Sequence, residues 1–452
     1  MNLTEALLRR SGAVGDAPGA EVRVVAKACL LDWLGVAIAG AEADEVGILV
    51  REALADGGGR HPLIARGERV ALRDAVLING TASHVLDYDD GLPAMSGHAS
   101  VAILPALLGI AERRQVNGEE LLRGLVVGAE MAGCLGTLVA PSHYERGFHA
   151  TATVGAVAAA SGCARLLGLD DEAAGAAMGL AAVRAGGLKA AFGTPAKPLQ
   201  VGWAALVGYT AACWAEGGMV APADAIGGPQ GFAAAESDGA ALEAALAPAP
   251  GGAHILDARF KRYASCGVTH ALLDALAAIG GARPLDAGEL LELKIGIGRG
   301  ADRICNIAAP ATGLEAKFSL RAVAAMHLLG ADLADPASFS DAAFRRLDPA
   351  RLYERISIEL VDDWPATRTQ VRLRTAEGWR QHLQDGAARP ADGAECLRLA
   401  ARKFNSLARP RLGAAKAERL HDMILGLETQ SDASELAALS SIAGGRAAAI
   451  AG

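Results

Sequence analysis

The chain of 452 residues has no two cysteines close enough in sequence to form a CxxC motif. Its seven cysteines stand at positions 29, 134, 163, 213, 266, 305 and 396. Zinc and iron–sulfur signatures are therefore absent. An odd number of widely spaced cysteines is typical of a reducing compartment, so we expect a cytoplasmic protein.

Other features that the chain lacks exclude further classes of protein. The net charge of -8 gives no basic surplus, so we expect neither nucleic acid nor an anionic membrane as a partner. The first residues, "MNLTEALLRRSGAVGD", have no long apolar core behind a basic end, so we predict no signal peptide. Glu130 interrupts the apolar run 121–141, which favours a buried helix over a membrane span.

What the chain does have is a globular composition, with 52% hydrophobic and 21% charged residues. A chain of this length exceeds one hydrophobic core, so two domains are expected. Long alanine-rich helical patterns fill residues 23–218, and helical patterns return after about residue 395. Small side chains of this kind predict closely packed helices.

Alternating apolar and polar residues replace this pattern after about residue 285. The stretches "ELLELKIGIG", "RISIELVDD" and "RTQVRLRTA" alternate as half-buried strands do, with helical segments between them. We therefore predict a mainly α fold: a large all-helical domain, residues 1–262 and 398–452, with an inserted smaller α+β lid domain, residues 263–397.

The segment "HVLDYDDGLP" contains three aspartates, which first suggests a metal site. An EF-hand loop starting at Asp87 needs an acid or amide where the chain has Gly91, so that pattern fails. An aspartate-rich magnesium motif fails as well, and we predict no metal. Asp89 and Asp90 are interpreted as turn caps.

Four reactive side chains stand at predicted helix starts: His98, His149, Lys197 and Cys266. Thr269 is the expected N-cap of the helix after Cys266. A helix N-terminus carries partial positive charge, which favours a bound anion, a neutral histidine and a thiolate. If these helix starts converge, they form an anion site with bases beside it.

Seven ordered blocks resemble the MmgE/PrpD family, which includes 2-methylcitrate dehydratase, cis-aconitate decarboxylase and iminodisuccinate epimerase. The blocks are "NGTASHVLDYDDG", "GHASVAILPALLGIAE", "RGFHATATVGAVAAA", "AFGTPAKPLQVGWAALVGYTAA", "GGPQGF", "KRYASCGVTHALLDAL" and "EAKFSLRAVAA". The resemblance implies a homodimer of two-domain subunits. It also implies an active site between the domains and chemistry without metal, nucleotide or flavin.

The resemblance also implies particular site residues. The positions that match the decarboxylase active site are Asp87, His98, His149, Lys197 and Lys261. Two positions depart from that pattern. Gly91 stands where the family has threonine, and Cys266 stands where it has histidine.

Reactions in this family create negative charge on a carboxylate next to the reacting carbon. Fixed cations stabilise such charge, a role that suits Lys197, with Lys261 or Arg262 for a second carboxylate. His98, His149 and Cys266 are the candidate bases. Asp87 is expected to orient a histidine.

Tyr144, Arg146 and Tyr263 lie close in sequence to these groups and are further candidates for substrate binding. His84, three residues before Asp87, is interpreted as structural.

The resulting prediction is a cofactor-independent acid/base enzyme acting on a small di- or tricarboxylate. We favour an epimerase or isomerase, because Cys266 offers a second proton-transfer group. The alternative is a dehydratase or decarboxylase. Alternatives of other classes are a metal-dependent lyase that uses the aspartate loop and a non-catalytic carboxylate-binding dimer.

Overall fold

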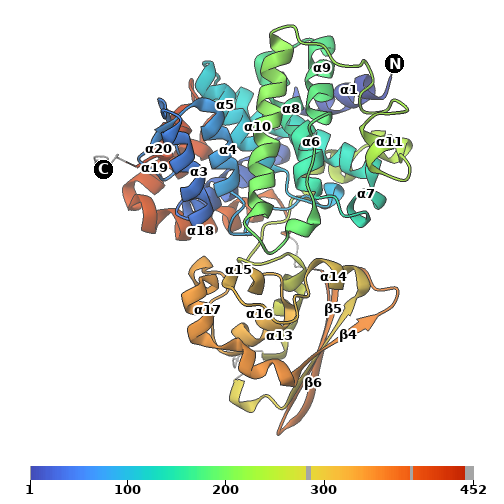
Figure 1. Cartoon of the computed structure of the whole chain (residues 1–452), viewed down its shortest axis with the longest axis vertical. Helices are drawn as coiled ribbons and strands as arrows, with labels where there is room; N and C mark the ends of the chain where they lie inside the picture. Colours follow the sequence, from blue (N-terminus) through green and yellow to red (C-terminus); the bar gives the residue numbers. More distant parts are fainter. Residues whose placement is uncertain (1, 281–286, 387–389, 443–452) are drawn as a thin grey trace.

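A computed structural model describes residues 2–280, 287–386 and 390–442. Figure 1 shows two lobes that meet at a narrow waist, the upper one helical and the lower one mixed. The predicted mainly α fold is confirmed. Residues 443–452, assigned to the predicted helical domain, lie outside the described residues, as do 281–286 and 387–389 of the predicted lid domain.

The upper lobe, here called the helical lobe, contains two sequence-distant groups of helices (Figure 1), and it also has a two-stranded antiparallel sheet. Their bounds are α1 Leu3–Gly15, α2 Ala20–Gly40, α3 Asp44–Ala55, β1 His61–Pro62, β2 Arg69–Val70, α4 Leu72–Ala82, α5 Ser100–Arg113, α6 Gly118–Val139, α7 Ser142–Glu145, α8 Ala150–Leu167, α9 Asp171–Ala182, α10 Ala196–Glu216, α11 Phe232–Glu236, α12 Leu242–Leu246, α18 Gly393–Leu412, α19 Ala414–Leu425 and α20 Glu435–Ser440.

The lower lobe, here called the lid lobe, places helices beside a four-stranded sheet (Figure 1). Its elements are α13 Val268–Gly280, β3 Glu292–Gly298, α14 Arg299–Ile304, α15 Gly313–Ala316, α16 Leu320–Leu328, α17 Asp341–Leu347, β4 Ile356–Val361, β5 Arg368–Thr375 and β6 Gly378–Asp385. The strand order is β4-β3-β5-β6, with β3 and β4 parallel and the other pairs antiparallel.

Close helix contacts through small residues hold the helical lobe together. At the crossing of α4 and α10, a Cβ added to Gly80 would lie 2.9 Å from the Cα of Gly202. A Cβ on Gly202 would lie 2.4 Å from the carbonyl oxygen of Leu77. Any larger residue at either glycine would force the two helices apart. This crossing fixes the N-terminal turn of α10 beside the loop that follows α4.

By length and composition, two helices, α6 and α8, could cross a membrane. If the bent pair α2–α3 is counted as one span, the number of candidate spans is three. In α6 and α8, 89% and 83% of the apolar window is buried against other parts of the protein. Residues 121–141 include most of α6, and its Glu130 is buried and paired with Arg10 at 2.7 Å. These contacts fit the interpretation of this run as a core helix.

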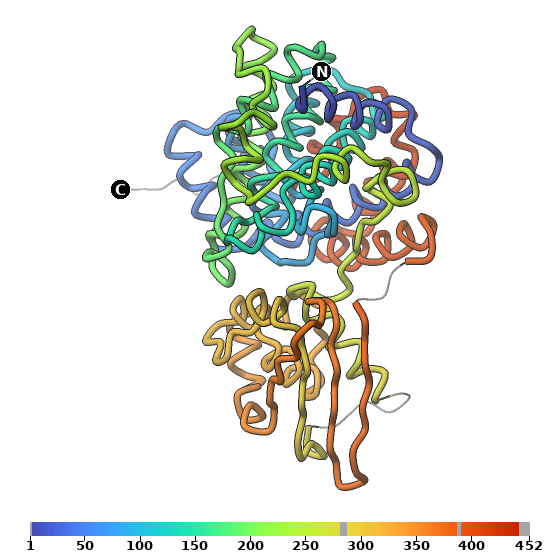
Figure 2. Tube along the Cα trace, turned by 90° about the vertical axis from the view of Figure 1, so that its right-hand side faces the viewer, coloured from blue at the N-terminus to red at the C-terminus, as the bar shows by residue number. Residues whose placement is uncertain are grey.

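The C-terminal helices pack back onto the start of the chain. Figure 2 shows the red C-terminal helices beside the blue N-terminal ones, and Lys403 of α18 pairs with Asp32 of α2 at 2.8 Å. The predicted domain boundary between residues 397 and 398 falls inside α18, so the chain has already returned to the helical lobe at Gly393. The exact domain boundaries stay a prediction.

Strand β6 is an element that the sequence pattern did not predict. Its sequence, "GWRQHLQD", is polar on both faces, and it pairs with β5 at the edge of the sheet. An edge strand with one exposed face needs few apolar residues, so alternation is weak there.

Candidate active site

Asp87 lies at the centre of a buried charge cluster, in the loop between α4 and α5. Its backbone has a φ of 49°, a left-handed conformation that aspartate tolerates better than most residues. Lys197 Nζ donates to its Oδ1 at 2.6 Å, and Lys261 Nζ lies 3.2 Å from the same oxygen. Lys261 also donates to the Asp87 carbonyl oxygen at 2.7 Å.

Two ammonium groups therefore share one buried carboxylate. Burial alone would raise the pKa of Asp87, but Lys197 and Lys261 outweigh it and hold the pKa far below the usual range. Asp87 Oδ2 has no hydrogen-bond partner among the described residues. At Asp87 itself, two ammonium groups face one carboxylate, and this local excess of positive charge suits an anionic ligand.

His84 joins this cluster, although the sequence indicated a structural role. Its Nε2 lies 2.8 Å from Lys197 Nζ, and its Nδ1 lies 3.0 Å from both carboxylate oxygens of Asp89. Because Lys197 can only donate, His84 Nε2 must accept, and the ring proton is on Nδ1. Burial lowers the pKa of His84 to about 4, so it is neutral at pH 7.

Asp89 holds two histidines, so its interpretation as a turn cap is wrong. Its Oδ2 lies 3.0 Å from His84 Nδ1 and 2.9 Å from His98 Nδ1. His98 Nδ1 also donates to the carbonyl oxygen of Asp90, at 2.9 Å. Burial would raise the pKa of Asp89, but both histidines counteract it and the pKa lies well below normal. Asp89 therefore orients both rings.

His84, Asp89 and His98 are the residues of this cluster that could hold a metal ion. Their potential ligand atoms lie within 4.8 Å of one another. Each Nδ1 instead donates a hydrogen bond to Asp89. The adjacent ammonium groups of Lys197 and Lys261 oppose a further cation. The residues therefore fit an anion better than a metal.

His149 is the N-cap of α8 and lies beside His84, with ring centroids 6.0 Å apart. Gln200 is oriented by Leu188, whose N–H donates to Gln200 Oε1 at 2.9 Å. The same Oε1 lies 3.2 Å from His149 Nδ1, so that nitrogen carries the proton and Nε2 is a base. Burial and then Lys197 lower the pKa of His149 well below its normal value.

Cys266 lies two residues before α13, on the lid side of the cluster. The helix begins at Val268, so Thr269 is in its first turn rather than at the N-cap, and its Oγ1 donates to the Cys266 carbonyl at 2.8 Å. A hydrogen bond from the Cys305 thiol, followed by the Lys261 charge, opposes burial and lowers the pKa of Cys266.

Lys317 is a second site residue that sequence analysis missed. Its buried ammonium crosses from the lid lobe to donate to the Leu86 carbonyl, next to Asp87. Its pKa is lowered to about 7, mainly by burial; Asp87 opposes this shift, and the charges of Lys261 and Lys197 contribute to it. It lies in the block "EAKFSLRAVAA", where an isolated lysine in an apolar stretch was the available signal.

The predicted substrate-binding residues divide into two groups. Tyr144 is largely buried near the cluster, and the charges of Cys266 and Asp87 add to burial in raising its pKa. Arg146 instead pairs with Asp238 at the surface, 3.4 Å away, outside the cluster.

Arg262 and Tyr263 also lie away from Asp87. Arg262 forms an ion pair with Asp274, and Tyr263 stacks edge-on with His270 at 5.2 Å. Both contacts lie on the lid side of the waist. Arg146 and Tyr263, chosen like Tyr144 for their proximity in sequence, make these other contacts because neighbours along a loop point in different directions.

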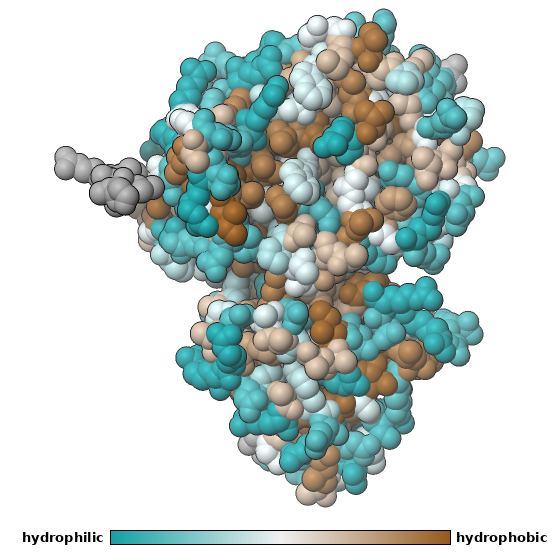
Figure 3. Space-filling model, in the orientation of Figure 1, coloured by the Kyte–Doolittle hydropathy of each residue, from teal (hydrophilic) through white to brown (hydrophobic). Residues whose placement is uncertain are grey.

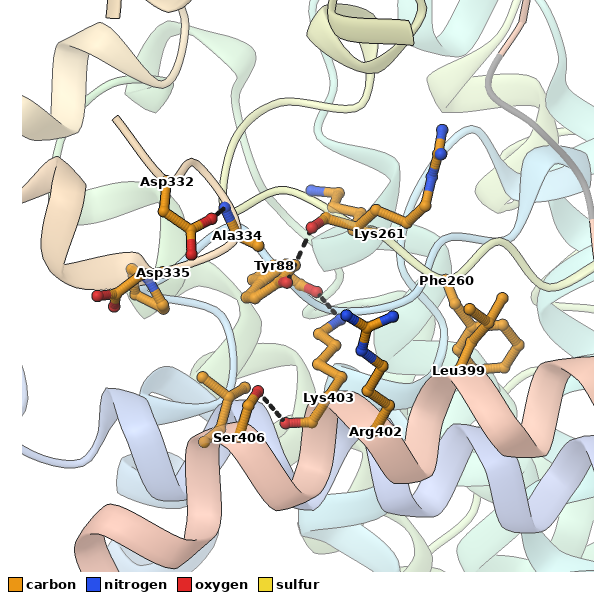
Figure 4. A pocket seen from close by; sticks show the side chains of 13 residues that line it. Tyr88, Phe260, Lys261, Asp332, Ala334, Asp335, Leu399, Arg402, Lys403 and Ser406 are labelled. Carbon is orange, nitrogen blue, oxygen red and sulfur yellow. Dashed lines mark hydrogen bonds between the residues drawn. The ribbon is translucent and has the colours of Figure 1, made fainter. Parts of the chain in front are cut away.

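A cleft of about 420 Å³ opens at the waist, on the other side of Lys261 (Figure 4). Tyr88 lies at its centre, donating its hydroxyl to the Arg262 carbonyl at 3.0 Å and accepting from Lys403 through its own carbonyl. Lys403 of α18 lines this cleft and is held in the helical lobe by its ion pair with Asp32 of α2. Lys261 both lines this cleft and contacts Asp87, so the Asp87 cluster adjoins the cleft.

These features define a mainly helical, two-lobed protein with a buried carboxylate–lysine–histidine cluster where its lobes meet. The MmgE/PrpD N-terminal domain matches residues 13–245 and the MmgE/PrpD C-terminal domain matches residues 263–429. The chain therefore belongs to the MmgE/PrpD family.

Several relatives of the chain are named cis-aconitate decarboxylase. The chain is 28% identical over 303 residues to the cis-aconitate decarboxylase of Homo sapiens, covering 64% of this chain and 62% of that protein. It is 27% identical over 321 residues to that of Mus musculus, covering 64% and 61%. For Aspergillus terreus the identity is 26% over 236 residues, covering 49% and 48%. The chain spans less than two thirds of each of these relatives.

Proposed function

We propose that this chain is a cofactor-independent lyase that decarboxylates a small tricarboxylate of the cis-aconitate type. The relatives named cis-aconitate decarboxylase support a lyase over the epimerase favoured by the sequence. The single observation that carries the proposal is the pair of ammonium groups, Lys197 and Lys261, on one buried carboxylate beside two neutral histidines, His84 and His149.

The reaction needs fixed positive charge and one proton. When cis-aconitate loses carbon dioxide from its CH2-carboxylate, the double bond shifts, and the carbon next to another carboxylate becomes carbanion-like. The charge spreads onto that carboxylate, where preorganised donors stabilise it. That carbon then takes one proton, which gives itaconate and carbon dioxide.

The lysines have donors left for this task. Lys197 donates two of its three N–H groups, one to Asp87 and one to His84. Lys261 donates a hydrogen bond to the carbonyl oxygen of Asp87. Lys317, whose ammonium makes a single hydrogen bond among the described residues, adds a third cation from the lid side. We assign these three lysines to the carboxylates of the substrate, with Asp87 holding Lys197 and Lys261 in place.

We assign proton donation to the Cys266 thiol. His84 and His149 each present an unprotonated Nε2, so they accept protons rather than supply them. Cys266 stands where the family pattern has histidine, and the Cys305 hydrogen bond stabilises the thiolate left after donation. His98, whose Nδ1 is fixed by Asp89, is the second proton-transfer group.

An epimerase is the second candidate, favoured by one observation. A thiol of lowered pKa and the base His149 are two different proton-transfer groups, which exchange at both faces of one carbon requires. No carbon dioxide leaves in that reaction. The two candidates therefore differ in a product that can be measured directly.

Proton NMR in D2O, with chelator present, distinguishes them. The full-length protein is given cis-aconitate, citrate, 2-methylcitrate or iminodisuccinate in separate tubes, with Lys197→Met as the matched inactive control. New vinylidene signals and carbon dioxide from cis-aconitate support the lyase. If an α-proton exchanges with inversion of the carbon and no carbon dioxide is released, the lyase proposal is rejected in favour of the epimerase. Silence with all four compounds rejects the proposal.

A further inference from the structure

Two buried cysteines contact one backbone carbonyl in the lid lobe, one through its N–H and the other through its thiol. The N–H of Cys266 donates to the Lys317 carbonyl oxygen at 3.1 Å, and the thiol of Cys305 reaches the same oxygen at 3.9 Å. Each of the two side chains also shifts the pKa of the other. Cys266 precedes α13, and Cys305 directly follows α14 as its C-cap. The two cysteines therefore come from segments almost forty residues apart in sequence.

The surroundings make the two thiols chemically unequal. Both pack with Phe318 in one small apolar cluster. The hydrogen bond from Cys305, and then Lys261, lower the pKa of Cys266, whereas burial raises the pKa of Cys305. A thiolate-forming cysteine in contact with a protonated one is the arrangement in which a first oxidation is followed by an intramolecular disulfide.

We propose that Cys266 and Cys305 are a peroxide-sensitive dithiol that switches the site between an open dithiol and a blocked disulfide form. The Cys266 thiolate attacks one oxygen of a hydroperoxide, the O–O bond breaks, and hydroxide or alkoxide leaves, giving a sulfenic acid. The Cys305 sulfur, losing its proton, then attacks the Cys266 sulfur and water leaves. The peroxide is reduced and two thiols are oxidised to one disulfide.

The disulfide has two consequences for the site. It removes the Cys266 thiol as a proton donor, and it joins the start of α13 to the end of α14. Because both segments flank Lys317, the bond also constrains the lid residue that reaches Leu86. This regulation goes beyond the proposed lyase activity and does not depend on which substrate the site accepts.

The test is peroxide titration of the intact full-length protein, followed by thiol counting and non-reducing peptide mass spectrometry. We expect a peptide pair linked through Cys266 and Cys305, a loss of two of the seven thiols and full recovery with dithiothreitol. In Cys305→Ser, the Cys266 sulfenic acid has no second thiol to react with, so it persists and is trapped by dimedone. Cys213→Ser, which removes the half-buried cysteine of α10, should still form the link.

Three results would overturn the proposal. One is peroxide uptake at Cys213 alone. Another is oxidation of Cys266 to sulfinic acid in the wild-type chain with no linked peptide. The third is a link that forms only after unfolding in urea, which would mean that the folded chain keeps the thiols apart. None of these readouts uses turnover, so failure of the lyase proposal leaves this test intact.

Discussion

The ammonium of Lys197 joins two groups of the loop after α4: Oδ1 of Asp87 at 2.6 Å and Nε2 of His84 at 2.8 Å. Lys197 belongs to the first turn of α10, whose axis is fixed against α4 by the Gly80–Gly202 contact. The charge cluster is therefore positioned by close backbone packing rather than by flexible side chains alone. Removing this one cation should disturb both its neighbours.

Lys197→Met should reduce kcat by about 10²–10³-fold, because it removes a fixed cation from the site of developing negative charge. It should also destabilise the fold by about 3 kcal/mol, since Asp87 keeps only Lys261 as a counter-ion. The measurements are initial rates of carbon dioxide release and thermal unfolding. Lys294→Met, which removes a partly exposed lysine paired with Glu292 in the sheet, should change neither. Equal losses in both variants would contradict the assigned role.

Asp89→Asn and Asp90→Asn should behave very differently, although the residues are neighbours. Asp89 is ionised and accepts from two histidines, so the amide would disorder both rings and reduce kcat by about 10–100-fold. Burial, followed by Asp32, raises the pKa of Asp90 to about 8, so its carboxyl is already neutral at pH 7. An amide at position 90 should therefore preserve activity. The pair of rates at pH 7 tests this contrast, and similar losses would refute it.

The sequence predicted the secondary structure well where periodicity was strong. The long helical patterns correspond to α2, α5, α6, α8 and α10, and three alternating stretches correspond to β3, β4 and β5. Edge strand β6 and the boundary inside α18 were not predictable, because both depend on which residues face solvent after packing. Helix starts were predicted to within a residue or two, as Thr269 illustrates.

The site was predicted in part, and the failures have a common physical cause. Helix-start position identified His98, His149 and Lys197, because local sequence determines where a helix begins. His84 and Lys317 function through contacts made across long separations, with Lys197 and Leu86 respectively. No local pattern encodes such contacts. Arg146 was chosen only for its position near His149 and instead lies on the surface.

The affinity for a tricarboxylate should decrease as pH rises through about 7. Lys317 has a folded pKa of about 7, far below its unfolded value, so it is charged at pH 6 and increasingly neutral at pH 8. Asp87, Lys261, Lys197 and Glu45 set this value together with burial. The bound anion should raise the pKa again, so the Kd for tricarballylate should rise about five-fold between pH 7 and 8.

Isothermal titration calorimetry in two buffers of different ionisation enthalpy measures both Kd and proton uptake. Lys317→Arg should bind tricarballylate with a nearly constant Kd over this range, since its charge does not titrate. Lys317→Met should bind weakly and equally at both pH values. Because the unfolded chain binds more protons between the two pKa values, the wild-type fold should also gain stability as pH rises above 7. An unchanged pH profile in Lys317→Met would exclude this lysine as the titrating group.

The homodimer implied by the family resemblance should form through the face around α10. Leu188 and Trp203, which are 58% and 52% exposed, line a groove of about 560 Å³ there, and Val183, next to the lining residue Arg184 in sequence, is 70% exposed. Figure 3 shows hydrophobic side chains on this face of the helical lobe. Trp203→Asp should produce a monomer in light scattering, because a charge at the centre of an apolar contact is costly to bury. Trp379→Asp, at an exposed lid position, is the matched control.

Restoring the two family residues should increase decarboxylation. Position 91 has room for a side chain, because a Cβ there meets nothing closer than the Gly97 carbonyl at 3.6 Å. Gly91→Thr with Cys266→His would provide the hydroxyl and imidazole that the decarboxylase pattern contains. If cis-aconitate is a poor natural substrate, carbon dioxide release should rise about ten-fold or more, the scale of one well-placed acid/base group. Cys266→Ser with Gly91→Thr controls for loss of the thiol alone. A decrease in the double variant would mean instead that Cys266 is the better proton donor in this chain, and that the reaction has been adapted to a thiol.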